Sequence, residues 1–127
     1  MNFGQAIASL YQNYATFTGR SRRSAYWFAY LYYSLVTFVI GIFTAQVDME
    51  TGEATNSPIY YIWILGNLLP ILAVGVRRMH DIGKSGWWQL LAFIPVLGVL
   101  VLIYWFALKG QGGANSYGPN PQEIGHF

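Results

Sequence analysis

Hydrophobic residues gather in three long runs that contain no Asp, Glu, Lys or Arg. The runs cover residues 25–45, 59–76 and 87–108 and are 21, 18 and 22 residues long. As helices rising about 1.5 Å per residue they measure roughly 27 to 33 Å, which matches a bilayer hydrocarbon core of about 30 Å. The pattern therefore predicts three transmembrane helices.

The third run, residues 87–108, is interrupted near its middle by Pro95 and Gly98. Both residue types are tolerated in transmembrane helices when neighbouring groups satisfy the freed backbone. Tryptophan and tyrosine mark both ends of the run, as is typical of segments that touch both membrane interfaces. We therefore expect one crossing, kinked at Pro95. The alternative is a re-entrant hairpin, which returns the C-terminal tail to the side where the run begins.

The first 24 residues have a helical pattern of their own. Apolar side chains recur at three- and four-residue steps and form one stripe of a helix; they are Phe3, Ile7, Leu10, Tyr11, Tyr14 and Phe17. The basic cluster follows this stripe rather than preceding it, so the segment does not fit a secretion signal. We predict an amphipathic helix that lies in the membrane interface and ends near Gly19. The alternative is a cytosolic helix docked on the loops.

The composition agrees with a membrane protein. Of the 127 residues 54% are hydrophobic and 9% are charged, whereas an average soluble domain carries about 25% charged residues. So few charges disfavour a soluble monomer, a disordered chain and a nucleic-acid-binding protein. The absence of cysteine excludes a disulfide framework, a thiol nucleophile and a cysteine metal site. The predicted fold class is all-α, a single polytopic membrane domain covering residues 1–127.

Charge alternates in sign between the segments that flank the spans. Residues 1–24 carry three arginines, the loop 46–58 carries three carboxylates, and the loop 77–86 carries three cations against Asp81. Lys and Arg in short loops favour the cytoplasmic side. We therefore expect a cytoplasmic N-terminus, an external acidic loop and a cytoplasmic basic loop. With three crossings the tail 109–127, which is rich in turn formers and predicted to be flexible, lies outside.

Polar and small residues within the spans are predicted to serve helix packing. The spans contain no ionisable residue, which disfavours ion-coupled transport. Thr37, Gly41 and Ala45 fall at four-residue steps, which permits close approach of another helix within the same unit or in a homo-oligomer. Asn67 can hydrogen-bond between helices, and Pro70 should kink the second span.

The loop 77–86 holds the densest set of chemical groups, RRMHDIGKSG, and two tryptophans follow it. Cations beside interfacial tryptophans suit an anionic lipid headgroup, and each basic residue near anionic lipid contributes about 1 kcal/mol. The alternative is that the loop only sets the topology and contains an internal Arg–Asp pair. The set predicted to bind lipid or a partner consists of Arg20, Arg22, Arg23, Arg77, Arg78, His80, Asp81, Lys84, Trp87 and Trp88.

Metal and catalytic chemistry find little support in this loop. Residues 83–85 read GKS, like the end of a phosphate-binding P-loop, but Arg78 stands where that motif needs its first glycine. His80 and Asp81 supply at most two metal ligands, and His126 is far along the chain. Neighbouring side chains on a helix also do not face each other as a catalytic dyad must. We therefore predict no metal, no cofactor and no catalytic residues.

Five ordered motifs resemble those of a known family. They are Gly19-Arg20-Ser21-Arg22-Arg23-Ser24 with Tyr26-Trp27-Phe28, Arg77-Arg78-Met79-His80-Asp81, Ser85-Gly86-Trp87-Trp88, Ile94-Pro95-Val96-Leu97-Gly98 and Asn115-Ser116-Tyr117-Gly118-Pro119-Asn120-Pro121. The set resembles the domain-of-unknown-function 805 family of small bacterial inner-membrane proteins, from about Tyr14 to Pro121. The resemblance implies a multi-pass protein of the bacterial inner membrane. It implies no activity, substrate or cofactor.

Three functions are compatible with these observations. The first is a non-enzymatic membrane module that binds anionic lipid or a protein partner through its basic cytoplasmic face. The second is an oligomeric transporter or channel subunit, with Ser34, Thr37 and Asn67 lining a path. The third is a membrane-surface enzyme centred on His80 and Asp81. The absence of ionisable residues in the spans favours the first over the second, and the incomplete catalytic set disfavours the third. Nucleic acid is not expected as a partner.

Overall fold

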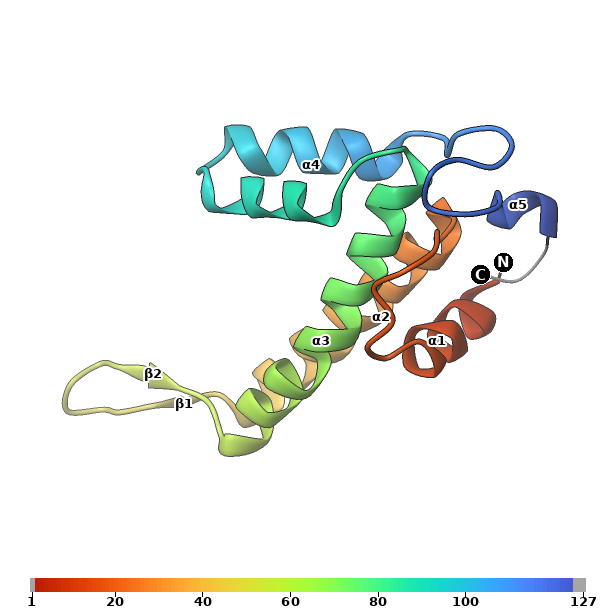
Figure 1. The fold of residues 1–127 in the computed structure, drawn as a ribbon. Coiled ribbons are helices and arrows are strands. Elements are labelled where there is room, and N and C mark those ends of the chain that lie inside the picture. The colour runs from red at the N-terminus through yellow and green to blue at the C-terminus, as the bar shows by residue number, and fades with distance from the viewer. Residues whose placement is uncertain (1, 125–127) are drawn as a thin grey trace.

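The computed structural model describes residues 2–124 and is mostly helical (Figure 1). The elements in chain order are α1 (Phe3–Gln12), α2 (Arg23–Thr44), β1 (Gln46–Val47), β2 (Ala54–Thr55), α3 (Pro58–Asp81), the 3₁₀ helix η1 (Gly86–Phe93), α4 (Leu97–Ala107) and α5 (Pro121–Ile124). The predicted all-α class is confirmed in this coarse form. The last residues of the predicted tail, 125–127, lie outside the described residues, and His126 with them.

Two long helices, α2 and α3, pack side by side and form the spine of the molecule (Figure 1). They have 22 and 24 residues and are long and apolar enough to cross a membrane. Only 6% of the apolar stretch of α2 and 28% of that of α3 is buried within the chain. A core helix of a soluble protein would hide such a surface, so these exposed apolar faces fit a lipid environment.

Helix α3 ends later than the sequence pattern indicated. It runs through residue 81, so the prediction of a loop beginning at residue 77 is wrong. After Gly75 the chain has no glycine or proline until Gly83, which has a positive φ of 80°. The Gly83 N–H donates to His80 O, and the Lys84 N–H donates to Met79 O at 2.9 Å. Glycine at this position closes the last turn, because only glycine adopts the left-handed conformation freely.

Proline inside α3 frees a backbone carbonyl, and the N-terminal segment satisfies it. Pro70 lacks the N–H that would otherwise donate to Gly66 O. The Tyr14 hydroxyl donates to that oxygen at 2.6 Å instead. One residue further on, the Tyr11 hydroxyl donates to Asn67 Oδ1 at 2.6 Å. The partner that the proline requires therefore comes from the chain itself.

Helix α1 is shorter than expected and packs along the spine. It begins with a capping box between Asn2 and Gln5 and ends at Gln12, so the expectation that it continues to Gly19 is wrong. The reason is local: the backbone N–H and the side chain of Asn13 both donate to Ser9 O and close the helix there. Helix α1 contacts α2 along its length and reaches the middle of α3 (Figure 1). It docks on the helix pair rather than on the loops.

The third predicted span folds as two short helices instead of one. Helices η1 and α4 lie side by side (Figure 1), and the Trp88 and Trp105 rings meet edge to face at 5.7 Å. A Cβ added to Gly98 would lie 1.7 Å from Leu91 O, so glycine is what permits this close approach. With 11 residues α4 measures about 16 Å and cannot cross a bilayer. The expectation of one kinked helix over residues 87–108 is therefore wrong, and the run folds back on itself as the hairpin alternative requires.

The loop between the spine helices is a short β-hairpin. Strands β1 and β2 pair antiparallel, with Gln46 opposite Thr55 and Val47 opposite Ala54. The turn is closed locally, because Asp48 Oδ1 accepts from the Glu50 N–H at 2.8 Å. These backbone hydrogen bonds hold the pKa of Asp48 below its usual value.

Candidate functional site

A buried carboxylate lies between two buried guanidinium groups where α3 ends. Arg20 Nη2 is 2.9 Å from Asp81 Oδ1, and Arg78 Nη1 is 2.8 Å from Asp81 Oδ2. All three side chains are shielded from solvent. We call this trio the ion network. Removing the carboxylate would leave both guanidinium groups buried without a counter-charge, and removing either arginine would leave one Asp81 oxygen without its partner, so the three side chains stabilise the fold as a unit.

The ion network holds the C-terminal tail in place. Arg20 Nη1 donates to Gly113 O at 2.7 Å and to Gly118 O at 3.3 Å, and its Nη2 donates to Gln111 O at 2.6 Å. In return the Gln111 N–H donates to Asp81 O at 2.8 Å. The expectation of a flexible tail is therefore wrong for this stretch, because its carbonyls are the acceptors that a buried arginine requires.

The same end of the molecule also holds the last turn of α4. Arg78 Nε donates to Phe106 O at 3.3 Å, and its Nη2 donates to Leu108 O. Arg23 Nη1 donates to Ala107 O at 3.1 Å. The last carbonyls of a helix have no partner within the helix and carry partial negative charge, so they are natural acceptors for cations.

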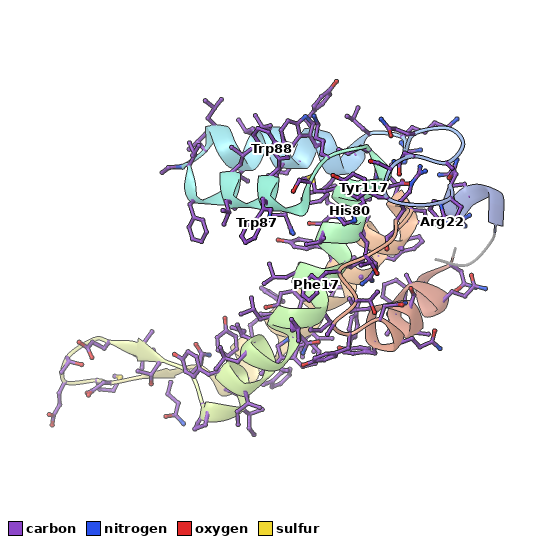
Figure 2. The ribbon with its side chains drawn as sticks, in the orientation of Figure 1. Phe17, Arg22, His80, Trp87, Trp88 and Tyr117 are labelled. Carbon is purple, nitrogen blue, oxygen red and sulfur yellow. The ribbon has the colours of Figure 1, made fainter. Side chains whose placement is uncertain are left out.

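His80 is engaged in packing rather than in a pair with its neighbour Asp81. Its Nδ1 lies 2.9 Å from Gly19 O, and its ring stacks on Tyr117 with centroids 4.0 Å apart and planes at 3° (Figure 2). Asn115 Nδ2 donates to His80 O at 2.9 Å. Since both oxygens of Asp81 face guanidinium groups, the two residues are not arranged as a catalytic dyad.

Arg77 joins the end of α3 to the segment that follows α1. Its Nε donates to Ser21 Oγ at 2.9 Å, and its Nη1 donates to Asn13 O at 3.1 Å and to Thr16 O at 2.7 Å. The Ser21 N–H donates to Arg77 O at 3.0 Å. The side chain is buried, with 4% of the residue exposed.

Other members of the predicted binding set face outward. Arg22 is half-buried, and its Nη2 donates to Pro121 O at 3.3 Å. Lys84 Nζ lies 4.5 Å from the centre of the Trp105 ring. Trp87 is 79% exposed and, with His80, lines an apolar groove of about 480 Å³ between α3 and η1. Figure 2 shows Arg22 and Trp87 on opposite sides of His80.

The structure thus divides the predicted binding set into two groups. The inward group comprises Arg20, Arg77, Arg78, His80 and Asp81, all of them buried. The outward group comprises Arg22, Arg23, Lys84, Trp87 and Trp88, which are half-buried or exposed. Since the inward residues are engaged within the fold, only the outward group of the predicted set is accessible to a ligand.

Two of the α2 residues predicted to serve helix packing, Thr37 and Gly41, contact α3 of the same chain. Trp63 Nε1 donates to Thr37 Oγ1 at 2.9 Å. Gly41 faces the Tyr60 ring, where a Cβ would lie 3.2 Å from Tyr60 Cε2. Ala45 caps the end of α2 and is exposed.

Sequence reasoning missed the partners that the tail and the first loop provide. Gly110 packs against the ion network so closely that a Cβ there would lie 2.1 Å from Asp81 Oδ2. The turn-rich tail composition indicated flexibility, whereas this glycine permits a close approach. A signal for the tyrosine contacts was present, since Pro70 requires a donor for Gly66 O.

All seven Lys and Arg residues lie at one end of the spine, which we call the basic end. It is defined by the start of α2, the end of α3 and the tail that the ion network holds, and the returning tail brings Lys109 there (Figure 1). Within residues 2–124, no three side chains of His, Cys, Asp or Glu gather to hold a metal ion.

These features define a class: a small helical protein with two membrane-length helices that a buried ion network clamps at one end. Comparison with known families agrees with this class. The chain matches, over residues 14–119, the model of a family described as a protein of unknown function (DUF805). The chain therefore belongs to the DUF805 family, and the resemblance seen in its motifs is confirmed.

Two relatives in Escherichia coli (strain K12) extend this result. The chain is 36% identical to the inner membrane protein YhaI over 118 residues, which is 93% of this chain and 96% of that protein. It is 38% identical to the inner membrane protein YhaH over 113 residues, which is 87% of this chain and 91% of that protein. No solved structure matches the chain significantly.

Proposed function

We propose that this chain is a non-enzymatic, multi-pass protein of the bacterial inner membrane that binds anionic lipid headgroups through its basic end. In this proposal α2 and α3 cross the bilayer, and the basic end and the C-terminal tail face the cytoplasm. The helix pair η1 and α4 stays on the cytoplasmic side, because neither helix is long enough to cross the bilayer.

The segregation of charge supports this orientation. The seven cations lie at the basic end, while Asp48, Glu50 and Glu53 lie in the hairpin at the other end of the spine. Lys and Arg next to membrane spans favour the cytoplasmic side. The family relatives are themselves named inner membrane proteins.

The observation that carries lipid binding is a shallow hollow at the start of α2. It has a volume of about 300 Å³ and is lined by Arg22, Arg23, Ser24 and Gln122. We call it the headgroup hollow. No side-chain hydrogen bond caps the first turn of α2, and the first two residues of the helix, Arg23 and Ser24, line the hollow, so the positive end of the helix dipole lies beside it. Two arginines beside a helix N-terminus suit a phosphate group.

Transport and catalysis receive less support from the contacts. Asn67 accepts from the Tyr11 hydroxyl and donates to Trp63 O, so its amide is engaged within the chain. The Thr37 hydroxyl accepts from Trp63. His80 and Asp81 are held by separate partners, as described above. Thr37 and Asn67, two of the residues proposed to line a path, are thus engaged within the chain, as are His80 and Asp81.

Single-cysteine labelling tests the orientation cleanly, because the chain contains no cysteine of its own. Ser116→Cys places a thiol on the tail and Thr51→Cys places one in the hairpin, and both positions are exposed. With a membrane-impermeant maleimide on intact spheroplasts, we expect labelling of Thr51→Cys at once and of Ser116→Cys only after the membrane is permeabilised. Labelling of Ser116→Cys from outside would contradict the proposal.

Lipid selectivity tests the function itself. The full chain is reconstituted with phosphatidylglycerol and phosphatidylcholine, extracted gently, and its bound lipids are counted by native mass spectrometry. We expect phosphatidylglycerol to be enriched, and the double variant Arg22→Gln, Arg23→Gln to reduce that enrichment about tenfold or more, since each cation contributes about 1 kcal/mol. The double variant Glu50→Gln, Glu53→Gln is the matched control at the other end. Equal enrichment in both double variants would refute lipid binding at the headgroup hollow.

A further inference from the structure

A second feature of the basic end is a cavity of about 150 Å³ between the end of α1, the segment leading to α2, the end of α3 and the tail. We propose that this cavity binds a phosphate-type oxyanion, with Arg77 as its principal counter-charge. The proposal goes beyond lipid binding at the headgroup hollow, because it concerns buried residues and a different set of contacts. We call this feature the Arg77 cavity.

The lining of the Arg77 cavity suits an anion. None of its ten lining residues is Asp or Glu. Hydroxyl groups and guanidinium groups both donate hydrogen bonds to phosphate oxygens. The lining residues that carry such groups are Ser9, Thr16, Thr18, Ser21, Arg20 and Arg77.

Arg77 is the residue that requires a counter-charge. Its Nε and Nη1 donate to protein groups, but its Nη2 is buried and has no hydrogen-bond partner within the described residues. No carboxylate of the described residues lies within 4.0 Å of it, whereas Arg20 and Arg78 share Asp81. A buried charge without a partner is costly, and a bound anion would offset that cost.

The balance of buried charge points the same way. The inward group contains three buried arginines, Arg20, Arg77 and Arg78, against the single carboxylate of Asp81. This leaves an excess of two positive charges in a region from which solvent is largely excluded. An oxyanion in the Arg77 cavity would reduce the excess and would lie beside the side chain of Arg77.

The size of the Arg77 cavity limits the ligand. Since one water occupies about 30 Å³ of the liquid, 150 Å³ accepts a phosphate group with a few waters but not a lipid with its acyl chains. Two sources share this chemistry: free inorganic phosphate, and the phosphate of a lipid headgroup that enters from the rim. The experiment distinguishes them.

Inorganic phosphate is the first probe. The full chain in a non-ionic detergent is titrated with sodium phosphate at constant ionic strength, and its Tm is followed by tryptophan fluorescence. We expect a saturable rise in Tm of about 5 °C or more at a phosphate concentration a hundred times Kd, because a ligand of the folded state stabilises it by mass action. Sodium chloride at the same ionic strength should give no such rise.

Two variants locate the site. Arg77→Lys keeps the charge but loses the free Nη2, and we expect it to weaken phosphate binding at least tenfold. Thr18→Val removes an exposed hydroxyl of the lining without disturbing the core, and we expect a loss of about fivefold. Thr51→Val in the hairpin and Lys109→Gln at the basic end are matched controls that should bind phosphate like the parent chain. The Thr18→Val result decides the matter if Arg77→Lys does not fold.

Nanodiscs identify the source of the anion. If phosphatidylglycerol nanodiscs abolish the phosphate response of the parent chain and phosphatidylcholine nanodiscs do not, the occupant is a lipid headgroup. If the response persists in both, the occupant is free phosphate. Either result supports the Arg77 cavity as an oxyanion site. The proposal would be overturned if phosphate gave no saturable rise in the Tm of the parent chain. It would also be overturned if Arg77→Lys and Thr18→Val bound phosphate as tightly as the parent chain. Lipid enrichment at the headgroup hollow depends on Arg22 and Arg23 instead, so each proposal can fail alone.

Discussion

The two ends of the α2–α3 spine carry charge in different ways. At the basic end, hydrogen bonds join residues far apart in the chain: Arg20 bonds to Asp81, 61 positions away, and to Gln111, 91 positions away. In the hairpin, Asp48 bonds to the backbone of Glu50, two positions away, and residues 46–55 are all exposed. In the β-hairpin, the charged residues are exposed to solvent and the hydrogen bonds of Asp48 join neighbours in the chain. Several charges of the basic end are buried and hold separate segments together.

The largest expected effect follows from removing the carboxylate of the ion network. Asp81→Asn keeps the shape of the side chain but leaves the guanidinium groups of Arg20 and Arg78 buried without a counter-charge. We expect a loss of about 3 to 5 kcal/mol in the free energy of unfolding. Glu50→Gln in the hairpin should change it by less than about 0.5 kcal/mol. Thermal unfolding of both variants in the same detergent measures the contrast, and equal Tm values would refute the division between the two ends.

A smaller effect is expected where η1 and α4 meet. Gly98→Ala places a Cβ against Leu91 O, a backbone atom that cannot move aside without opening the pair. We expect a loss of about 1 to 3 kcal/mol, as for other overpacked sites, together with a weaker near-ultraviolet circular dichroism signal from Trp88 and Trp105. Gly112→Ala is the matched control, since its Cβ meets no atom within 4 Å. A stable Gly98→Ala variant with unchanged dichroism would argue for a single helix across residues 87–108.

The smallest expected effect is the loss of the Asp48 hydrogen bonds in the β-hairpin at low pH. The backbone N–H groups of Glu50 and Thr51 lower the pKa of Asp48 below its ordinary value of 3.8. The stabilisation of the turn by these hydrogen bonds is therefore complete above pH 3.8. It is lost as the pH falls further, through the lowered pKa of Asp48. NMR titration of the two amides should show this loss below pH 3.8, and Asp48→Asn should abolish the titration. An Asp48 pKa at or above 3.8 would contradict the local hydrogen bonds, and a large drop in global Tm in Asp48→Asn would contradict the independence of the hairpin.

Several features of the molecule could be predicted from short stretches of sequence. The charge-free runs located α2 within two residues at each end and the start of α3 within one. The charged residues between the runs separated an acidic loop from basic segments. The end of α3 was missed by five residues because the arginines were assigned to a loop, although arginine is a good helix former.

The basic end could not be predicted in the same way. Arginine and aspartate at positions 20 and 81 show no sign of their pairing in sequence alone, and a turn-rich tail has the composition of a flexible terminus whether or not it docks. Similarly, Pro95 and Gly98 are compatible with a kinked helix and with a hairpin. Only the close packing of Gly98 against Leu91 O distinguishes the two.

The sequence by itself determined the elements that depend on local pattern: the apolar helices, the charge of each loop and the family motifs. Tertiary structure alone decided which charges are buried, where the tail lies and that Lys109 joins the other six cations at one end. The physical reason is that apolar run length and loop charge act within a few residues. A buried ion network instead depends on segments 60 to 100 positions apart, which meet only when the chain has folded.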